Sequence, residues 1–240
     1  MRAATNKMGG LERAPQAPRA RRAPAKPGHS SKAPRARRAP GHPARSSILR
    51  RALGGVALGL ALLAIPGAAF AGNEALWDLL RGGGQIVLMR HTTTTPGVGD
   101  PPGFRLDDCA TQRNLTEAGR QEARRIGAVF QDRGIPIGRV LSSRWCRCME
   151  TARLAFGRAE HWAALDSNFE DRNREPERTA AIRARANQRP ESGNLILVTH
   201  GANIVPITGS QPAPGEFFVL TPEGGGRFRI AGRLAPSALD

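Results

Sequence analysis

Short apolar runs alternate with amphipathic stretches between residues 73 and 230, and this alternation predicts the secondary structure. Apolar runs flanked by Gly or polar residues are typical of buried strands, and apolar residues three and four positions apart are typical of helices. The predicted strands are 85–89, 140–141, 162–165, 195–198, 217–220 and 228–230. The predicted helices are 73–80, 116–133, 145–156 and 176–187.

Local signals mark the ends of several of these elements. Asn73 and Thr116 stand where N-capping residues are expected, and Pro176 stands in a first helical turn, where proline is tolerated. Residues 224–226 are all glycine and separate the last two strands, so these strands are expected to form an antiparallel pair. The second helix has one apolar face, which consists of Ala118, Ile126, Val129 and Phe130.

The order of the elements predicts the fold class. Continuous apolar strands that alternate with amphipathic helices indicate a mostly parallel sheet covered on both faces. We therefore expect an α/β protein with three layers, α/β/α, whose single domain covers residues 72–240.

Charge is distributed unevenly along the 240 residues. Residues 1–51 hold 14 of the 36 Lys and Arg but one of the 20 Asp and Glu, whereas residues 52–71 carry no charge. The sequence from residue 72 onward is therefore nearly neutral, and we expect no nucleic-acid partner for it. Residues 1–45, rich in Arg, Pro and Ala, are expected to be a disordered basic segment.

Residues 46–71 have the layout of a secretory signal peptide. Arg50 and Arg51 precede the apolar run 52–65, and a small-x-small triplet ends at Ala71, after which we expect cleavage. This predicts a periplasmic or secreted protein without stable membrane insertion after cleavage. The alternative is an uncleaved anchor, and the sequence leaves the choice between general and twin-arginine export open.

Chemically active side chains follow three of the predicted strands. Arg90 and His91 end the first, Ser142 and Ser143 end the second with Arg147 shortly after, and His200 with Gly201 follows the fourth. Because ligands bind beyond the carboxyl ends of parallel strands, we expect two histidines and two arginines to converge there. His161 begins a predicted strand without other candidate polar groups beside it, and we expect a structural role for it.

Arginines beside uncharged imidazoles suit a phosphoryl group. A guanidinium binds phosphate oxygens in pairs, and a neutral imidazole is a competent nucleophile. Two histidines without well-placed carboxylates provide too few ligands for a typical metal site, and the arginines would repel a divalent cation. We therefore expect no metal and no cofactor.

Four segments resemble motifs of the histidine phosphatase superfamily, also called phosphoglycerate mutase-like, and the resemblance spans roughly residues 85–235. They are Leu88-Met89-Arg90-His91 with Thr94, Leu115 to Gly119 with Gln121 and Ala123, Leu141-Ser142-Ser143 to Arg147 with Thr151-Ala152, and Val198-Thr199-His200-Gly201. The segments occur in the family's order, each at a strand end or a helix start.

The resemblance implies a phosphoglycerate mutase-like fold and a specific mechanism. His91 would attack phosphorus and become a phosphohistidine, Arg90, Arg147 and His200 would hold the phosphoryl oxygens, and water would then release phosphate. Thr94 and Gly201 would also bind phosphate. For this, His91 must be neutral, with the nitrogen away from phosphorus donating to a carbonyl.

The sequence departs from the family pattern at two positions. Thr92 follows His91 where the family usually has Gly, and Ser167 stands where many members have the Glu that protonates the leaving group. The general acid therefore stays open. Glu170 and Asp171 are the candidates we name as catalytic; the other carboxylates close enough to substitute are Asp166, Asp107 and Asp108.

The three cysteines, Cys109, Cys146 and Cys148, all follow the predicted signal peptide. In an oxidising compartment two of them should pair. Cys146 and Cys148 are too close in sequence for an easy mutual bridge, so we expect one of them to bond to Cys109. Three free thiols are the alternative.

The sequence thus predicts an exported phosphatase that hydrolyses a phosphomonoester through a phosphohistidine, with cell-envelope sugar phosphates as candidate substrates. One alternative is a phosphohistidine or phosphoramidate phosphatase that lacks the usual general acid. A second is a non-catalytic phosphate-binding module. A third is a protein that binds anionic surfaces or nucleic acid through residues 1–51.

Overall fold

The computed structural model describes residues 67–239. The predicted basic segment 1–45 lies outside the described residues, and so does the predicted signal peptide 46–71 except for residues 67–71. In the part of the chain that is described, no helix combines the length and hydrophobicity needed to cross a membrane.

A six-stranded sheet forms the middle layer, in the order β3-β2-β4-β1-β5-β6. β3, β2, β4 and β1 run parallel to one another, whereas β5 is antiparallel to both β1 and β6. This confirms the mostly parallel sheet and the closing antiparallel pair. The strands are β1 Ile86–Arg90, β2 Ile137–Ser142, β3 Glu160–His161, β4 Asn194–Thr199, β5 Phe217–Gly224 and β6 Arg227–Leu234.

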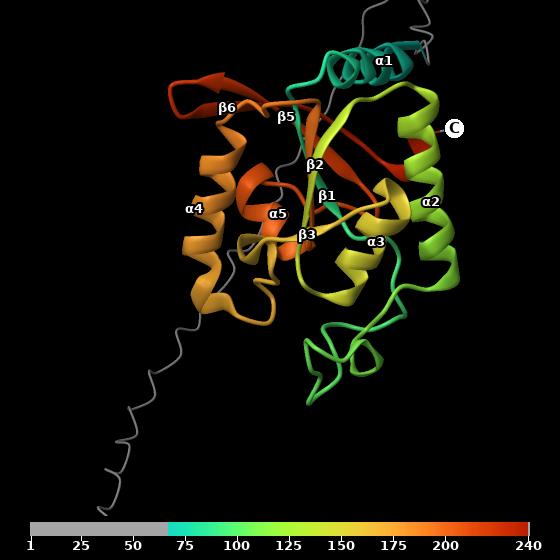
Figure 1. Ribbon diagram of the computed structural model, residues 1–240, viewed down its shortest axis with the longest axis vertical. Coiled ribbons are helices and arrows are strands. Elements are labelled where there is room, and N and C mark those ends of the chain that lie inside the picture. The colour runs from blue at the N-terminus through green and yellow to red at the C-terminus, as the bar shows by residue number, and fades with distance from the viewer. Residues whose placement is uncertain (1–66, 240) are drawn as a thin grey trace, which may run out of the picture. The chain divides into compact units, whose positions relative to one another are not determined.

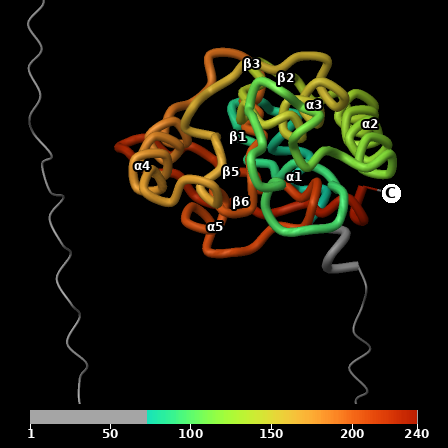
Figure 2. Tube along the Cα trace, turned by 90° about the horizontal axis from the view of Figure 1, so that it is seen from below, coloured from blue at the N-terminus to red at the C-terminus, as the bar shows by residue number. Residues whose placement is uncertain are grey.

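Helices cover both faces of the sheet, which confirms the three-layer α/β/α fold (Figure 1). Figure 2 shows α4 and α5 on one side of the strands, with α2 and α3 on the other. The helices are α1 Gly67–Arg81, α2 Glu117–Asp132, α3 Cys146–Phe156, α4 Glu175–Ala186 and α5 Gly201–Thr208.

Side chains that alternate along the strands pack into two hydrophobic cores, one on each face of the sheet. In β1, Val87 and Met89 pack with side chains of α1, α2 and α3, whereas Ile86 and Leu88 pack with side chains of α4 and α5. Successive strand residues point to opposite faces, so a continuous apolar run is what a sheet covered on both sides requires. The strands are therefore packed between helices on both faces.

Two element predictions are wrong at their boundaries. The first helix begins at Gly67 and is not capped at Asn73, because the alanine-rich residues before Asn73 favour helix and extend it. The run 162–165 is not a strand: β3 consists of Glu160–His161, and Ala163–Leu165 form a 3-10 turn in which the Leu165 amide donates to the Trp162 carbonyl. Periodicity does not separate these outcomes for a run of four residues.

The second helix follows its prediction closely. Thr116 caps α2, since its side-chain oxygen accepts a hydrogen bond from the amide of Gly119. Ile126 and Phe130 are buried as expected, but Ala118 is exposed, and Gly119 and Ala123 take its place on the buried face.

The connection between β1 and α2, residues 91–116, extends beyond the carboxyl edge of the sheet (green in Figure 1). A disulfide between Cys109 and Cys146 joins it to the first residue of α3. This confirms the expected pairing, and it leaves Cys148 as a buried free thiol. The loop is thereby held against the strand ends that the sequence marked as chemically active.

Candidate active site

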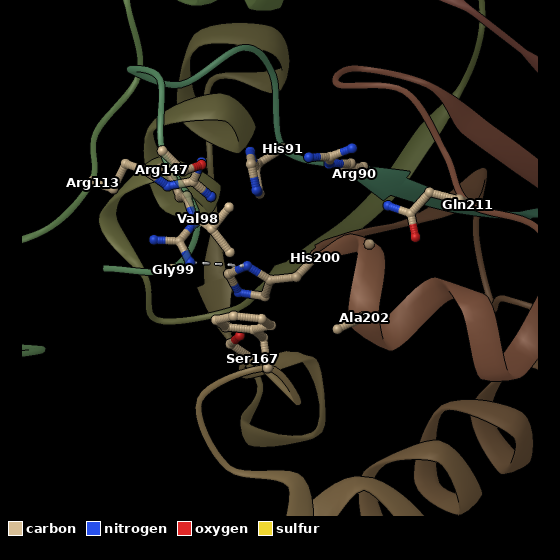
Figure 3. Close-up of a pocket in the computed structure, with 13 residues that line it drawn as sticks. Arg90, His91, Val98, Gly99, Arg113, Arg147, Ser167, His200, Ala202 and Gln211 are labelled. Atoms are coloured by element: carbon tan, nitrogen blue, oxygen red, sulfur yellow. Dashed lines mark hydrogen bonds between the residues drawn. The ribbon is translucent and has the colours of Figure 1, made fainter. Parts of the chain in front are cut away.

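The carboxyl ends of β1, β2 and β4 bring the predicted side chains together. The Cα register pairs Arg90 with Thr199 and Ser142 with Val198, so the three strands end level with one another. The residues that follow, His91, Ser143 and His200, continue this alignment: His91 donates its amide to the Thr199 carbonyl, and Ser143 donates to the Val198 carbonyl. The convergence expected from the sequence is present (Figure 3).

His91 is held as a neutral imidazole in one tautomer. Its Nδ1 lies 2.9 Å from the carbonyl oxygen of Thr92 and donates to it, which leaves Nε2 with its lone pair. Burial, and then the positive charge of Arg147, lower the pKa of His91 to about 3. A buried, uncharged imidazole whose Nδ1 donates to a carbonyl has its Nε2 lone pair available for nucleophilic attack.

His200 lies beside His91, with ring centroids 5.5 Å apart. Burial, followed by the charge of Arg147, holds the pKa of His200 well below its usual value. Its Nε2 is 2.9 Å from the Ser143 hydroxyl, and its Nδ1 is 3.4 Å from Arg147 Nη2. Because a guanidinium only donates, Nδ1 is the acceptor, and Nε2 carries the proton and donates to Ser143.

Three arginines face the same space. Arg90 ends β1, Arg147 lies in the first turn of α3, and Arg113 comes from the loop before α2. Burial and the charge of Arg113 lower the pKa of Arg90, and burial and the charge of Arg147 lower the pKa of Arg113. Mutual repulsion among guanidinium groups is relieved when an anion binds between them.

Each of these arginines has an N–H donor without a hydrogen-bond partner among the described residues. Arg90 Nη1 donates to the Pro212 carbonyl at 2.8 Å, and Arg113 Nη1 donates to the Gly97 carbonyl at 2.7 Å. Among the described residues, the Nε atoms of Arg90, Arg113 and Arg147 are all buried without a partner. Because unpaired buried N–H groups are rare, three around one pocket indicate a site for an anion that accepts several hydrogen bonds.

These groups line a cavity of about 270 Å³. Gly201 and Ala202, at the start of α5, also line it, so the helix presents its positive end there. The remaining lining residues are Gly97, Val98, Gly99, Ser167, Phe169 and Gln211. No Asp or Glu side chain of the described residues is among the lining residues.

Three predicted site residues lie elsewhere. Thr94 forms an isolated bridge with Leu115 and does not line the pocket. Glu170 turns to the backbone of the loop, where its Oε1 lies 3.4 Å from the amide nitrogen of Asp100, and Asp171 lies 3.8 Å from Arg178. Both carboxylates follow the lining residues in sequence, but neither residue is among those that line the cavity.

The other acidic candidates also have partners outside the pocket. Asp166 is buried and accepts from the amide of Arg144 at 2.9 Å and from His161 Nε2 at 3.2 Å, so His161 does have a polar neighbour, contrary to expectation. Asp107 pairs with Arg105 on the surface, and Asp108 caps a 3-10 turn at the amide of Ala110.

Thr92 does not obstruct the pocket. Its side chain is fully buried, and its hydroxyl lies 3.1 Å from the Thr151 hydroxyl. Since Thr151 donates to the Arg147 carbonyl at 2.7 Å, Thr92 is the donor of this pair. The methyl-bearing residue that replaces the family glycine thus ties the end of β1 to the helix that carries Arg147.

Sequence reasoning missed three polar residues at the site, Asp100, Arg113 and the lining residue Gln211. Asp100 accepts hydrogen bonds from Arg147 Nη1 at 2.8 and 3.0 Å and has no exposed side-chain surface. Arg113 stood close to the recognised Leu115-Thr116 motif, and this proximity was the one signal available. Asp100 lies in a stretch rich in Pro and Gly, which carries no periodicity.

The described residues contain no group of three or more His, Cys, Asp or Glu side chains that could hold a metal ion.

Comparison with known proteins agrees with this geometry. Residues 86–174 match the model of the histidine phosphatase superfamily (branch 1). This range includes β1, α2 and α3. The curated proteins give no match.

Several solved structures are similar to the chain. The protein histidine phosphatase SixA complexed with tungstate is 19% identical, with 65% of this chain and 99% of that chain covered and a TM-score of 0.47. A phosphoserine phosphatase mutant from Entamoeba histolytica in complex with phosphoserine is 12% identical, with 65% and 98% covered and a TM-score of 0.45. A mycobacterial glucosyl-3-phosphoglycerate phosphatase is 18% identical, with 61% and 96% covered and a TM-score of 0.39.

The match over residues 86–174 includes Arg90, His91 and Arg147, the residues that form the centre of the pocket. The match identifies residues 86–174 as sequence of the histidine phosphatase superfamily (branch 1).

Proposed function

We propose that the chain hydrolyses a phosphomonoester through a phosphohistidine formed on His91. The observation that carries this proposal is the set of three buried, unpaired arginine Nε atoms around a neutral imidazole. A phosphoryl group supplies the oxygens these donors lack, and it is the electrophile that the imidazole can attack.

The reaction has two balanced steps. His91 Nε2 forms a bond to phosphorus as the bond from phosphorus to the leaving oxygen breaks, and the leaving oxygen takes a proton from a solvent water. Water then attacks the phosphohistidine, the N–P bond breaks, and inorganic phosphate leaves. Arg90, Arg113 and Arg147 hold the phosphoryl oxygens while charge moves between them, which is where most of the rate acceleration is expected.

A second candidate is a phosphoramidate or phosphohistidine phosphatase, and one observation favours it. None of the described pocket-lining side chains is a carboxylic acid, and Ser167 lines the pocket where the family often has Glu. A phosphoramidate leaves through nitrogen, which is basic enough to take its proton from solvent. An alkoxide leaving group depends more on an acid from the protein, an assistance usually worth about a hundredfold or more.

The cavity suggests a small phosphorylated substrate. The volume of about 270 Å³ is several times that of a phosphoryl group, so part of the leaving group would fit inside and a larger substrate would extend from the mouth. Val98 and Phe169, which line the pocket, are two of the exposed large apolar side chains among the described residues. They would contact the leaving group, and the sugar ring of a cell-envelope sugar phosphate has an apolar face for them.

The test is phosphate release by residues 72–240 from a panel of aryl, alkyl, sugar and phosphoramidate substrates, beside His91→Ala. Turnover that disappears in the variant supports the nucleophile. Esters and phosphoramidates turned over alike favour the phosphomonoesterase, whereas alkyl esters at least a hundredfold slower than phosphoramidates favour the second candidate. A folded protein that binds phosphate but turns over nothing is a binding module and contradicts both.

Export is part of the proposal and has its own test. The signal layout of residues 46–71 places the mature N-terminus at Gly72. N-terminal sequencing of the protein secreted by a producing cell should begin at Gly72. If the cell-associated protein keeps residues 1–51 intact, export is contradicted. The alternative that these residues bind anionic surfaces is then favoured.

A further inference from the structure

The Asp100 carboxylate is surrounded by hydrogen-bond donors. Oδ1 accepts from the backbone amide of Arg113 and from Arg147 Nη1, both at 2.8 Å. Oδ2 accepts from Trp145 Nε1 at 2.9 Å and from Arg147 Nη1 at 3.0 Å. The side chain has no exposed surface, and both oxygens only accept, so this environment selects a carboxylate.

An amide at this position cannot satisfy the same donors. In either orientation, the NH₂ group of asparagine would face an N–H group, from Arg113 and Arg147 on one side or from Trp145 and Arg147 on the other. A buried donor left facing a donor loses its hydrogen bond outright. Charge, and not shape alone, is therefore what this position requires.

The contact fixes which edge of the Arg147 guanidinium is available. Nη1 is committed to Asp100, and Nη2 reaches His200 through a long contact of 3.4 Å. Nε is buried without a partner. An arginine has several torsions, so holding one terminal nitrogen limits the directions in which Nε and Nη2 can donate.

Asp100 also joins two parts of the pocket wall. Arg147 belongs to α3, whereas Arg113 belongs to the loop, and the same carboxylate oxygen accepts from both. Figure 3 shows Arg113 and Arg147 on one side of His91 and Arg90 on the other. The side of the pocket opposite Arg90 is therefore assembled around one buried negative charge.

We propose that Asp100 is the positioning residue of this pocket, and that it holds Arg147 in the orientation that contacts the phosphoryl group. It does not touch the substrate, and it acts through Arg147. The inference rests on the proposed function, since it assigns Arg147 to the transferred phosphoryl group.

The experiment is a double-mutant cycle on residues 72–240 with D100N, R147Q and the double variant, measuring kcat, KM and the Kd of inorganic phosphate. We expect D100N and R147Q each to lower kcat about a hundredfold, and D100N to lower it less than threefold in the R147Q background. D107N, which removes an exposed carboxylate of the same loop, should match the wild type within twofold.

Additive losses in the cycle would mean that Asp100 acts independently of Arg147, and they overturn the proposal, as does an unchanged kcat in D100N. Should D100N fail to fold, D100S removes the charge without placing an N–H against the donors, and the cycle is measured with it. If the wild type binds phosphate but has no turnover, the proposed function fails, while the same coupling in Kd still decides whether Asp100 positions Arg147.

Discussion

The Nδ1 of His91 donates to the Thr92 carbonyl, which leaves the lone pair of Nε2 free, and three guanidinium groups line the same cavity. Burial and the charge of Arg147, with smaller effects from Arg90 and Arg113, lower its pKa to about 3. An ordinary imidazole would be partly protonated near neutral pH and would lose its nucleophilic lone pair. The arginines that we propose to bind the anion thus also lower the pKa of the proposed nucleophile and keep it neutral.

The lowered pKa makes His91 a source of acid sensitivity. Between pH 6.5 and about pH 3 the unfolded chain binds a proton at His91 that the native protein does not, so native stability falls as pH falls. We expect His91→Asn to remove this loss. Relative to the wild type, the variant should gain about 1.4 kcal/mol of unfolding free energy per pH unit below 6.5.

Urea unfolding at pH 7, 6, 5 and 4 measures the difference. Parallel curves for the two proteins would show that His91 titrates normally in the native state, and they would remove the basis for a neutral nucleophile.

Arg113 supplies the third guanidinium of the site. If its unpaired Nε binds the phosphoryl group, Arg113→Gln should weaken binding of inorganic phosphate and lower kcat/KM by roughly tenfold or more, because a charge-assisted hydrogen bond contributes about 1.5–3 kcal/mol. Calorimetric titration with phosphate and initial-rate kinetics provide the two readouts. Arg105→Gln, an exposed arginine of the same loop, is the control. Equal affinities in all three proteins would place Arg113 outside the site.

At the scale of elements, the approach of α2 to the loop after β1 decides where His91 stands. The carbonyl of Thr93 accepts from the amide of Thr116, and the amide of Thr93 donates to Glu122 at 3.0 Å. A Cβ added at Gly119 would lie 2.0 Å from the Thr93 carbonyl oxygen. The glycine of this motif is therefore required by close backbone contact.

Gly119→Ala tests this contact. Although alanine is favoured over glycine in a helix by about 1 kcal/mol, we expect a net destabilisation of about 2 kcal/mol, since the backbone carbonyl must move. Activity should fall as well, because Thr93 follows His91 by two residues. Denaturant unfolding and phosphate release are measured beside Gln121→Ala, an exposed change in the same helix. A variant as stable and active as the wild type would show that the loop tolerates the displacement.

The elements also show what sequence could and could not predict. Arg90, His91 and His200 were found because they directly follow buried apolar runs, whose direction a parallel sheet fixes. Asp100 was not found, because its position depends on how a loop without periodicity folds over α3. Glu170 was assigned to the pocket from its place in the sequence, which says nothing about the direction a side chain takes after a turn.

At the scale of the whole molecule, the Cys109–Cys146 bond joins the loop to the sheet edge. The linked residues are 37 positions apart, and Cys146 directly precedes Arg147. The amide of Cys146 also donates to the side chain of Gln112 at 3.0 Å. The disulfide therefore supports both the stability of the domain and the placement of the arginines.

Removal of this bond should have two effects. A closed loop of 37 residues corresponds to about 4 kcal/mol of chain entropy in the unfolded state, so Cys109→Ser with Cys146→Ser should lower the unfolding free energy by about that amount. KM should rise, because the loop carries Asp100 and Arg113. Urea unfolding and steady-state kinetics compare this variant with the oxidised wild type. Unchanged kinetics would show that hydrogen bonds alone hold the loop.

We propose that His91 carries the phosphoryl group during turnover. The most direct measurement is to mix excess substrate with residues 72–240, quench in alkali, where a phosphoramidate bond survives, and map the modified residue by mass spectrometry. We predict one added phosphoryl group on His91 in the wild type and none in His91→Asn. Substrate turnover with no phosphorylated His91, or with the group on another residue, would contradict the account.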